Sequence, residues 1–166
     1  MVSKKVENAL NAQVAKEAMS SQVYLAMASW AEVQGLEGIA AFLYSHSDEE
    51  RMHALKLMRY INERGGHAVV PALAKPPKEM KGIMDVFKSI LQQEVEVSGE
   101  INGIVDLCLK EKDYTTHNFM QWYVAEQIEE ERLARTMLDK LNLIGSDKGG
   151  LYLFDRDLSG AASSKP

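Results

Sequence analysis

The fold is decided by residues 39–60, which read IAAFLYSHSDEERMHALKLMRY. Every third or fourth residue of this stretch falls on one apolar row that polar residues interrupt at its middle: Ile39, Leu43, His46, Glu50, His53, Leu57 and Tyr60. A row with this spacing is typical of the buried face of an amphipathic α-helix. We therefore expect Glu50 and His53 to point into the core of the protein.

Three further segments carry rows of the same kind. Their inward-facing residues are Leu10, Val14, Glu17, Ser21, Tyr24, Ala28 and Ala31 in the first segment, Ile83, Phe87, Ile90, Glu94, Val97, Ile101, Ile104 and Cys108 in the third, and Met120, Tyr123, Gln127, Glu130, Ala134, Met137 and Leu141 in the fourth. In each row the polar residues lie near the middle of the segment. At about 1.5 Å of rise per residue, all four helices bring them to one central layer, whichever way each helix runs.

Turn signals predict where the helices end and how they are connected. The expected helices are residues 5–33, 38–64, 82–111 and 115–142. The first two helices, like the last two, are joined too tightly to be anything but antiparallel neighbours. The connection 67–81 contains three prolines, and the roughly 17 residues between the pairs reach more than about 50 Å when extended. The sequence therefore predicts an all-α four-helix bundle with one long crossover.

The C-terminal part of the chain predicts a short addition to this bundle. The apolar piece LYLF at 151–154 follows a glycine-rich turn and suggests a brief fifth helix. We expect one domain over residues 1–158 and a disordered tail over 159–166, because the tail is rich in small and polar residues.

Composition restricts the class of protein. The chain has 166 residues, of which 46% are hydrophobic and 26% charged, as in a soluble globular domain. A net charge of −5 without a basic cluster argues against nucleic acid as the main partner. No apolar run approaches the roughly 20 residues that a membrane span needs. The single cysteine excludes an internal disulfide, and we expect a cytoplasmic protein with no membrane partner.

Several carboxylates in one core layer repel each other and are poorly solvated, unless they are protonated, paired with cations or bound to metal. Glu50 and His53 lie three residues apart, so both can reach one ion. This pair alone is a weak motif that also fits a surface ion pair. Because Glu17, Glu94 and Glu130 interrupt other rows at the same level, we favour a metal site. If these carboxylates are uncompensated without metal, replacing Glu94 by Ala should cost the metal-free bundle little stability or even increase it, whereas marked destabilisation would indicate a structural hydrogen-bond network.

The types of ligand narrow the choice of metal. Carboxylates with a single imidazole suit Mn(II), Fe(II) and, less selectively, Zn(II). Four or five carboxylates carry too much negative charge for one divalent ion. Two ions bridged by Glu50 balance this charge better. Two adjacent Fe(II) ions can each give O2 one electron, which supports oxidation of Fe(II) without a free oxygen radical.

Neighbouring residues allow several interpretations. Glu49, Glu126 and Glu129 lie beside the layer and are candidates for a third ion site, whereas a solvated face remains the alternative. Tyr24 could hydrogen-bond a ligand, accept an electron, or serve only as a core tyrosine with a satisfied hydroxyl. His46 is either a core histidine or a ligand on an access route, and we favour the first.

Together these residues resemble the bacterial non-haem ferritins over nearly the whole chain up to Leu158. The resemblance rests on Glu17 with Tyr24, on EERMH at 49–53, on Glu94, on NFMQWYVAEQIEEE at 118–131, and on GLYLFD at 150–155, which is similar to the start of the family's fifth helix. It implies a hollow shell of 24 subunits that oxidises Fe(II) with O2 or H2O2 and stores ferric mineral.

The resemblance also implies an iron centre within each subunit. Its ligand sets are Glu17, Glu50 and His53 for one iron, Glu50, Glu94 and Glu130 for the second, and Glu49, Glu126, Glu129 and Glu130 for a third site. Gln127 and Tyr24 complete the catalytic set that we expect for this ferroxidase.

Related families fit less well. Bacterioferritins carry a second Glu-x-x-His where this chain has Gln127 and Glu130, and a haem-ligating Met where it has Arg51, so haem is not expected. Rubrerythrins need a cysteine-rich module, and the DNA-protecting mini-ferritins build their site between subunits. Outside these families, a non-catalytic helical assembly protein and a soluble di-metal oxidase or catalase remain as alternatives.

Overall fold

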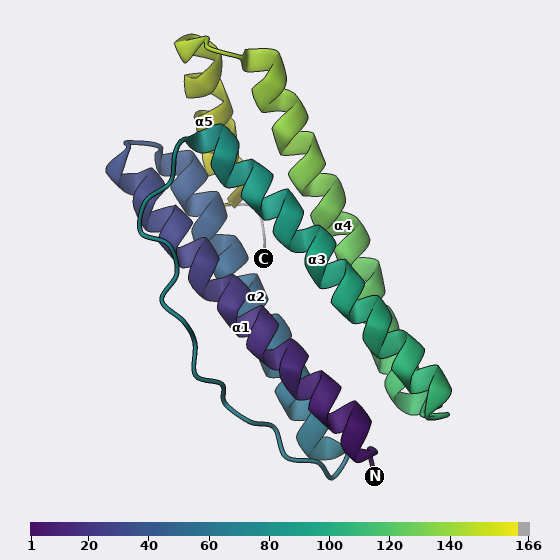
Figure 1. Ribbon diagram of the computed structural model, residues 1–166. Coiled ribbons are helices and arrows are strands. Elements are labelled where there is room, and N and C mark those ends of the chain that lie inside the picture. The colour runs from purple at the N-terminus through teal and green to yellow at the C-terminus, as the bar shows by residue number, and fades with distance from the viewer. Residues whose placement is uncertain (163–166) are drawn as a thin grey trace.

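The computed structural model describes residues 1–162 as five α-helices without a β-strand in that range (Figure 1). The helices are α1 (Lys4–Val33), α2 (Glu37–Glu63), α3 (Ile83–Lys110), α4 (Tyr114–Ile144) and α5 (Lys148–Ala162). The four long helices confirm the predicted bundle, and their ends agree with the predicted ones to within about two residues, the ordinary uncertainty of helix boundaries.

Local chemistry sets the ends of the helices. The Ser3 hydroxyl accepts a hydrogen bond from the backbone N–H of Val6 at the start of α1. At the start of α4, the Asp113 carboxylate accepts from the backbone N–H of Thr116 at 3.0 Å and also binds Arg64 at 3.1 Å. Helix α1 ends before Gly35, whose φ of +76° favours glycine. These caps satisfy helix-end groups that would otherwise lack partners.

The long crossover runs along the α1–α2 pair from one end of the bundle to the other (Figure 1). Asn11 of α1 ties it down, because its side chain donates to the carbonyl of His67 at 3.1 Å and accepts from the backbone N–H of Val69 at 2.8 Å. The connection therefore lets α3 start at the far end of the bundle.

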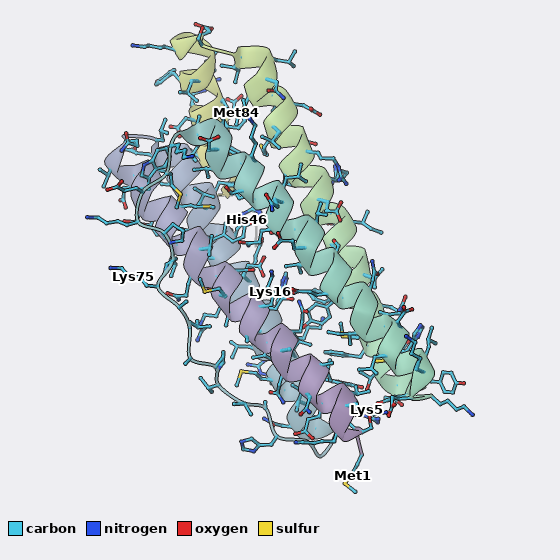
Figure 2. All side chains as sticks on the ribbon, viewed as in Figure 1. Met1, Lys5, Lys16, His46, Lys75 and Met84 are labelled. Atoms are coloured by element: carbon cyan, nitrogen blue, oxygen red, sulfur yellow. The ribbon has the colours of Figure 1, made fainter. Side chains whose placement is uncertain are left out.

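The core consists of two apolar clusters with a polar layer between them. One cluster contains Leu43 and Phe87, and the other contains Leu10 and Met120. The residues predicted to face inward are all buried except Ile83 and Glu130, which are half-buried. The side chains of the layer meet between the helix pairs, where His46 is seen (Figure 2).

Helix α5 is longer than the sequence suggested. It continues to Ala162, four residues beyond the predicted domain end at Leu158, and residues 163–166 of the predicted tail lie outside the described part. Leu158 is buried in the core cluster, and no proline follows it before the helix end. The helix crosses the start of α2, where the Asp155 carboxylate accepts from the backbone N–H of Ile39 at 2.8 Å.

Among residues 1–162, no helix combines the length and the apolar content that crossing a membrane requires.

Candidate metal centre

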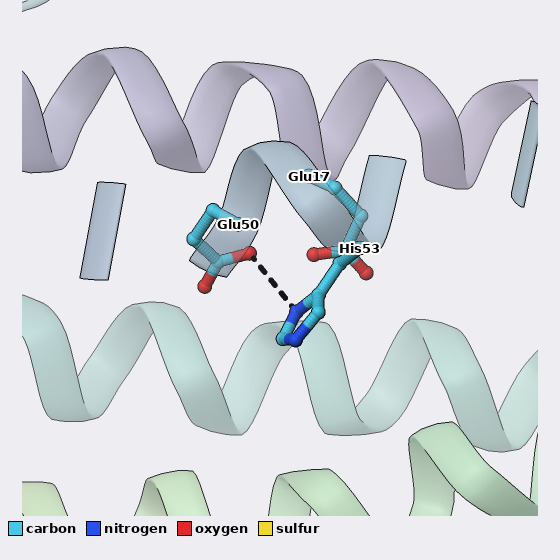
Figure 3. Close-up of side chains that lie close together, drawn as sticks. All are labelled: Glu17, Glu50 and His53. Carbon is cyan, nitrogen blue, oxygen red and sulfur yellow. Dashed lines mark ion pairs between the residues drawn. The ribbon is translucent and has the colours of Figure 1, made fainter. Parts of the chain in front are cut away.

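Glu17, Glu50 and His53 converge in the middle of the bundle (Figure 3). Each is buried, and each offers one ligand atom within 4.8 Å of the other two. The Nδ1 atom of His53 lies 3.6 Å from Oε2 of Glu50, one helical turn away on α2. Glu17 reaches them from α1, which lies beside α2. The structure thus brings together the first ligand set that the resemblance implied.

The two carboxylates of this group are held where ionisation is unfavourable. Burial raises the pKa of Glu17 well above its ordinary value, and the charge of Glu50 raises it further. The Gln13 amide, which donates to Oε1 of Glu17 at 2.8 Å, opposes that rise.

Burial likewise raises the pKa of Glu50, to about 8. A hydrogen bond with Glu17 opposes the rise, while the charges of Glu94 and Glu130 add to it. Within the described residues, Oε2 of Glu50 is buried and has no hydrogen-bond partner. A divalent cation in this position would stabilise the ionised carboxylates, so the residues fit the metal that their chemistry suggests.

Glu94 is fully buried, but its surroundings differ from those of Glu50. The Tyr24 hydroxyl donates to Oε1 at 2.9 Å, and the Gln127 amide donates to Oε2 at 3.2 Å. Burial raises the pKa of Glu94, and these two hydrogen bonds oppose the rise. Of the two alternatives for Glu94, these contacts favour the structural hydrogen-bond network, because the chain itself supplies two donors.

A second group of donor atoms contains His46, Glu49 and Glu130. The Nε2 atom of His46 lies 3.8 Å from Oε2 of Glu49 and 3.9 Å from Oε2 of Glu130. His46 is buried, as expected for a core histidine, but its ring faces two carboxylates as well as apolar neighbours. Sequence reasoning did not single out this grouping, although His46 precedes Glu49 by one helical turn.

The other two ligand sets are met only in part. Among residues 1–162, two groups of three donor residues have ligand atoms close enough for one ion, and neither group includes Glu94. The second predicted set, Glu50, Glu94 and Glu130, therefore does not meet this criterion. Glu126 is half-buried and Glu129 is exposed, and neither joins Glu49 and Glu130 in a group. In the acidic run 126–131 of α4, the helical period is the only sequence signal that separates inward-facing from outward-facing carboxylates.

A groove between α2 and α4 leads to this layer. It is lined by His53 and by Trp122, whose ring carries the Lys56 ammonium 3.2 Å from its centre. Glu49 also lines the groove. His53 is therefore the ligand of the first group that a solute in this groove meets.

Comparison with known proteins gives a consistent result. The family model for the ferritin-like domain matches residues 7–144. The chain is 42% identical over 165 residues to a bacterial non-heme ferritin of Campylobacter jejuni, with 99% of each chain covered. It is 44% identical over 158 residues to a probable bacterial non-heme ferritin-like protein of Haemophilus influenzae, covering 95% of this chain and 96% of that one.

Among solved structures, the open pore ferritin of the hyperthermophilic archaeon Archaeoglobus fulgidus matches with a TM-score of 0.94. Its sequence is 40% identical, and the match covers 96% of this chain and 98% of that chain. The similarity therefore includes the four long helices that carry the polar layer.

Proposed function

The chain belongs to the ferritin family, and from that premise we propose that it stores iron by oxidising Fe(II) within each subunit. The observation that carries the proposal is the convergence of Glu17, Glu50 and His53 from two helices in a buried layer. Two carboxylates and one imidazole are a donor set that Fe(II) accepts readily. Fe(II) is here a substrate, which the site binds and then passes on as Fe(III).

A second Fe(II) would share Glu50 with Glu94 and Glu130. Support comes from the charges of both residues, which raise the pKa of Glu50. Glu94 can still bind a cation while it accepts hydrogen bonds from Tyr24 and Gln127, because a carboxylate has about four lone-pair positions. In this arrangement the two donors hold Glu94 in place for the ion.

The oxidation needs two electrons for each O2 that becomes H2O2, and two adjacent Fe(II) ions supply one each. If H2O2 is the oxidant, the same two electrons and two protons give two molecules of water. Protons held by the layer before binding leave when the cations bind, since metal ligands must be ionised. The protein contributes the fixed carboxylates, which stabilise the higher charge of Fe(III) more than that of Fe(II).

The proposal extends to the assembly and its location. We propose a shell of 24 subunits that encloses ferric mineral, as the ferritin relatives suggest, in the cytoplasm. At 18.6 kDa per chain, 24 copies amount to about 446 kDa (24 × 18.6), so size-exclusion chromatography tests the assembly. A small oligomer of a few chains would contradict the shell.

Oxidation is tested by adding Fe(II) in air to the metal-free protein and following the amber absorbance of the ferric product. Glu17→Ala and Glu50→Ala are expected to slow it strongly. Glu32→Ala is the matched control, because Glu32 is an exposed acid near the end of α1 that accepts from the Tyr44 hydroxyl. An oxidation rate in Glu50→Ala that equals that of the parent would contradict the assignment.

A further inference from the structure

A line of hydrogen bonds connects the surface of α4 with the buried Glu94 of α3. Arg135, whose side chain is 53% exposed, donates to Oε2 of Glu131 at 2.8 Å, and the Ser98 hydroxyl of α3 donates to Oε1 at 2.7 Å. The Gln127 amide donates to the Ser98 oxygen at 3.4 Å and to Oε2 of Glu94 at 3.2 Å. The line therefore crosses repeatedly between two helices that lie side by side (Figure 1).

The outer end of the line fixes the direction of its hydrogen bonds. Glu131 is paired with Arg135, so its carboxylate is ionised and can only accept. The single hydrogen of the Ser98 hydroxyl must then lie in the 2.7 Å contact with Glu131. Only lone pairs of Ser98 remain for Gln127, so the amide must face Ser98 with its NH2 group rather than with its oxygen.

Glu131 also keeps the Ser98 hydroxyl away from the backbone of α3. A helical serine can donate to the carbonyl four residues earlier, which here is that of Glu94. This carbonyl has two lone pairs, of which the α-helix uses one for the backbone N–H of Ser98. The Gln127 amide donates to the same carbonyl at 3.1 Å. Without Glu131, the Ser98 hydroxyl would therefore compete with Gln127 for this acceptor.

The surroundings of Gln127 give Ser98 a role in holding it. The amide nitrogen has two hydrogens, and its three acceptors are the carbonyl and carboxylate of Glu94 and the hydroxyl of Ser98. A cavity of about 130 Å³ between α3 and α4 is lined by Ser98, Gln127 and Glu131, among others, and is large enough for water. Without the Ser98 oxygen, the amide can turn toward water in this cavity and release Glu94.

We propose that Ser98 and Glu131 are positioning residues for the second Fe(II) position. Glu131 directs the serine hydroxyl, so that Ser98 presents only an acceptor to the Gln127 amide. Gln127 in turn holds the Glu94 carboxylate in the orientation that binds the ion. Neither Ser98 nor Glu131 belongs to the ligand sets that the resemblance implied. The inference rests on the proposed function, because that function assigns Glu94 to the second Fe(II).

The test is anaerobic titration of the assembled, metal-free protein with Co(II), followed by the visible absorbance of Co(II) and by calorimetry. The ion that Glu94→Gln removes identifies the second position. Ser98→Ala removes the hydroxyl, whereas Ser98→Thr keeps it. Glu131→Met keeps the length of the side chain but removes the carboxylate that accepts from Ser98. Its control is Asp139→Asn, which removes an exposed acid about two turns further along α4.

We expect Ser98→Ala and Glu131→Met each to lower the affinity for the second Co(II) by roughly 10-fold, the low end of what removal of a supporting residue costs. The first Co(II), in the group that contains Glu17, is expected to bind with unchanged affinity, which a general loss of folding would not give. Ser98→Thr and Asp139→Asn are expected to bind both ions as the parent does. Circular dichroism and size-exclusion chromatography show that each variant is folded and assembled.

Four results would overturn the inference. The first is parental Co(II) binding in either Ser98→Ala or Glu131→Met. The second is an equal loss in Ser98→Ala and Ser98→Thr, which would indicate packing rather than the hydroxyl. The third is an equal loss in Asp139→Asn and Glu131→Met, which would indicate charge at long range. The fourth is a Glu94→Gln protein that binds as many Co(II) ions as the parent.

Failure of the proposed function is distinguishable from these results. A parent that binds both Co(II) ions but does not oxidise Fe(II) in air would contradict the proposed oxidation. The effect of the Ser98 and Glu131 variants on Co(II) binding would still be measured, because it involves neither oxygen nor electron transfer.

Discussion

Glu50 and Glu94 are both buried in the polar layer, yet the protein compensates them in different ways. Glu94 accepts hydrogen bonds from Tyr24 and Gln127, one on each oxygen. Glu50 faces another carboxylate and an imidazole, and its Oε2 atom has no hydrogen-bond partner among the described residues. The difference teaches that the fold itself compensates Glu94 before any cation binds, whereas Glu50 depends on a cation that the chain does not supply.

The largest expected effect concerns the pH dependence of stability without metal. The unfolded chain releases the Glu50 proton near pH 4.5, but the folded chain keeps it up to about pH 8. Between these values the folded state binds more protons, so the free energy of unfolding falls as the pH rises, by up to about 5 kcal/mol from this group. Denaturant titrations of the metal-free protein at pH 5 to 8 measure this fall in the free energy of unfolding.

The control for this experiment is Glu50→Gln, which cannot ionise and is expected to show a much shallower slope. Saturation of the parent with Zn(II) is expected to flatten the slope as well, because a bound cation favours the ionised carboxylate. A metal-free parent whose stability stays level or increases across this range would contradict the interpretation.

A matched pair of isosteric variants compares the two carboxylates directly. In Glu94→Gln, an amide donor replaces the oxygen that accepts from Gln127, so two donors face each other in the core. We expect the metal-free protein to lose about 1–3 kcal/mol of stability at pH 7. In Glu50→Gln we expect no loss or a gain, since at pH 7 the parent must take up a proton on Glu50 when it folds, whereas glutamine is neutral in both states.

Denaturant titration of both variants against the parent makes this comparison. Equal destabilisation of the two variants would mean that Glu50 is also part of a hydrogen-bond network of the fold.

A smaller effect is expected for Tyr24→Phe. The change removes one hydrogen bond to the buried Glu94 carboxylate and should cost about 1–2 kcal/mol of stability. If Tyr24 serves only to orient Glu94, Fe(II) oxidation continues in this variant at a modestly reduced rate. A Tyr24→Phe protein of parental stability that no longer oxidises iron would instead favour electron transfer from the tyrosine.

The smallest effect is expected for Gln13→Met, which tests cation binding at the group that contains Glu50. Methionine keeps the volume of the buried side chain but removes the amide that donates to Glu17. We expect a loss of roughly 10-fold in Co(II) affinity at the Glu17, Glu50 and His53 group. The replacement Leu10→Met, about one turn earlier on α1, is the control and should leave the affinity unchanged.

The sequence predicted the bundle well because helical periodicity is a local property. Rows at three- and four-residue spacing identified the buried face of each long helix, and the prolines of residues 67–81 identified the crossover. The length of α5 was underestimated, because the small and polar residues after Leu158 resemble those of a disordered tail. Packing of Leu158 on the core, which composition does not reveal, supports the longer helix.

The sequence predicted where the polar layer lies, but not which side chains contact each other within it. Helical spacing placed Glu17, Glu50 and Glu94 on the inward faces of three helices, and all three are buried. The donors to Glu94 come from α1 and α4, and such contacts depend on how the helices are rotated against each other. For the same reason, the approach of Glu130 to His46 is evident only once α2 and α4 are in place.

The most direct measurement is a crystal structure of the protein soaked in Zn(II), with anomalous scattering recorded at the zinc edge. We predict a peak among Glu17, Glu50 and His53, with Glu94 still bonded to Tyr24. If zinc bound only at the outer surface and left the layer between the helices without a peak, the central claim would be contradicted.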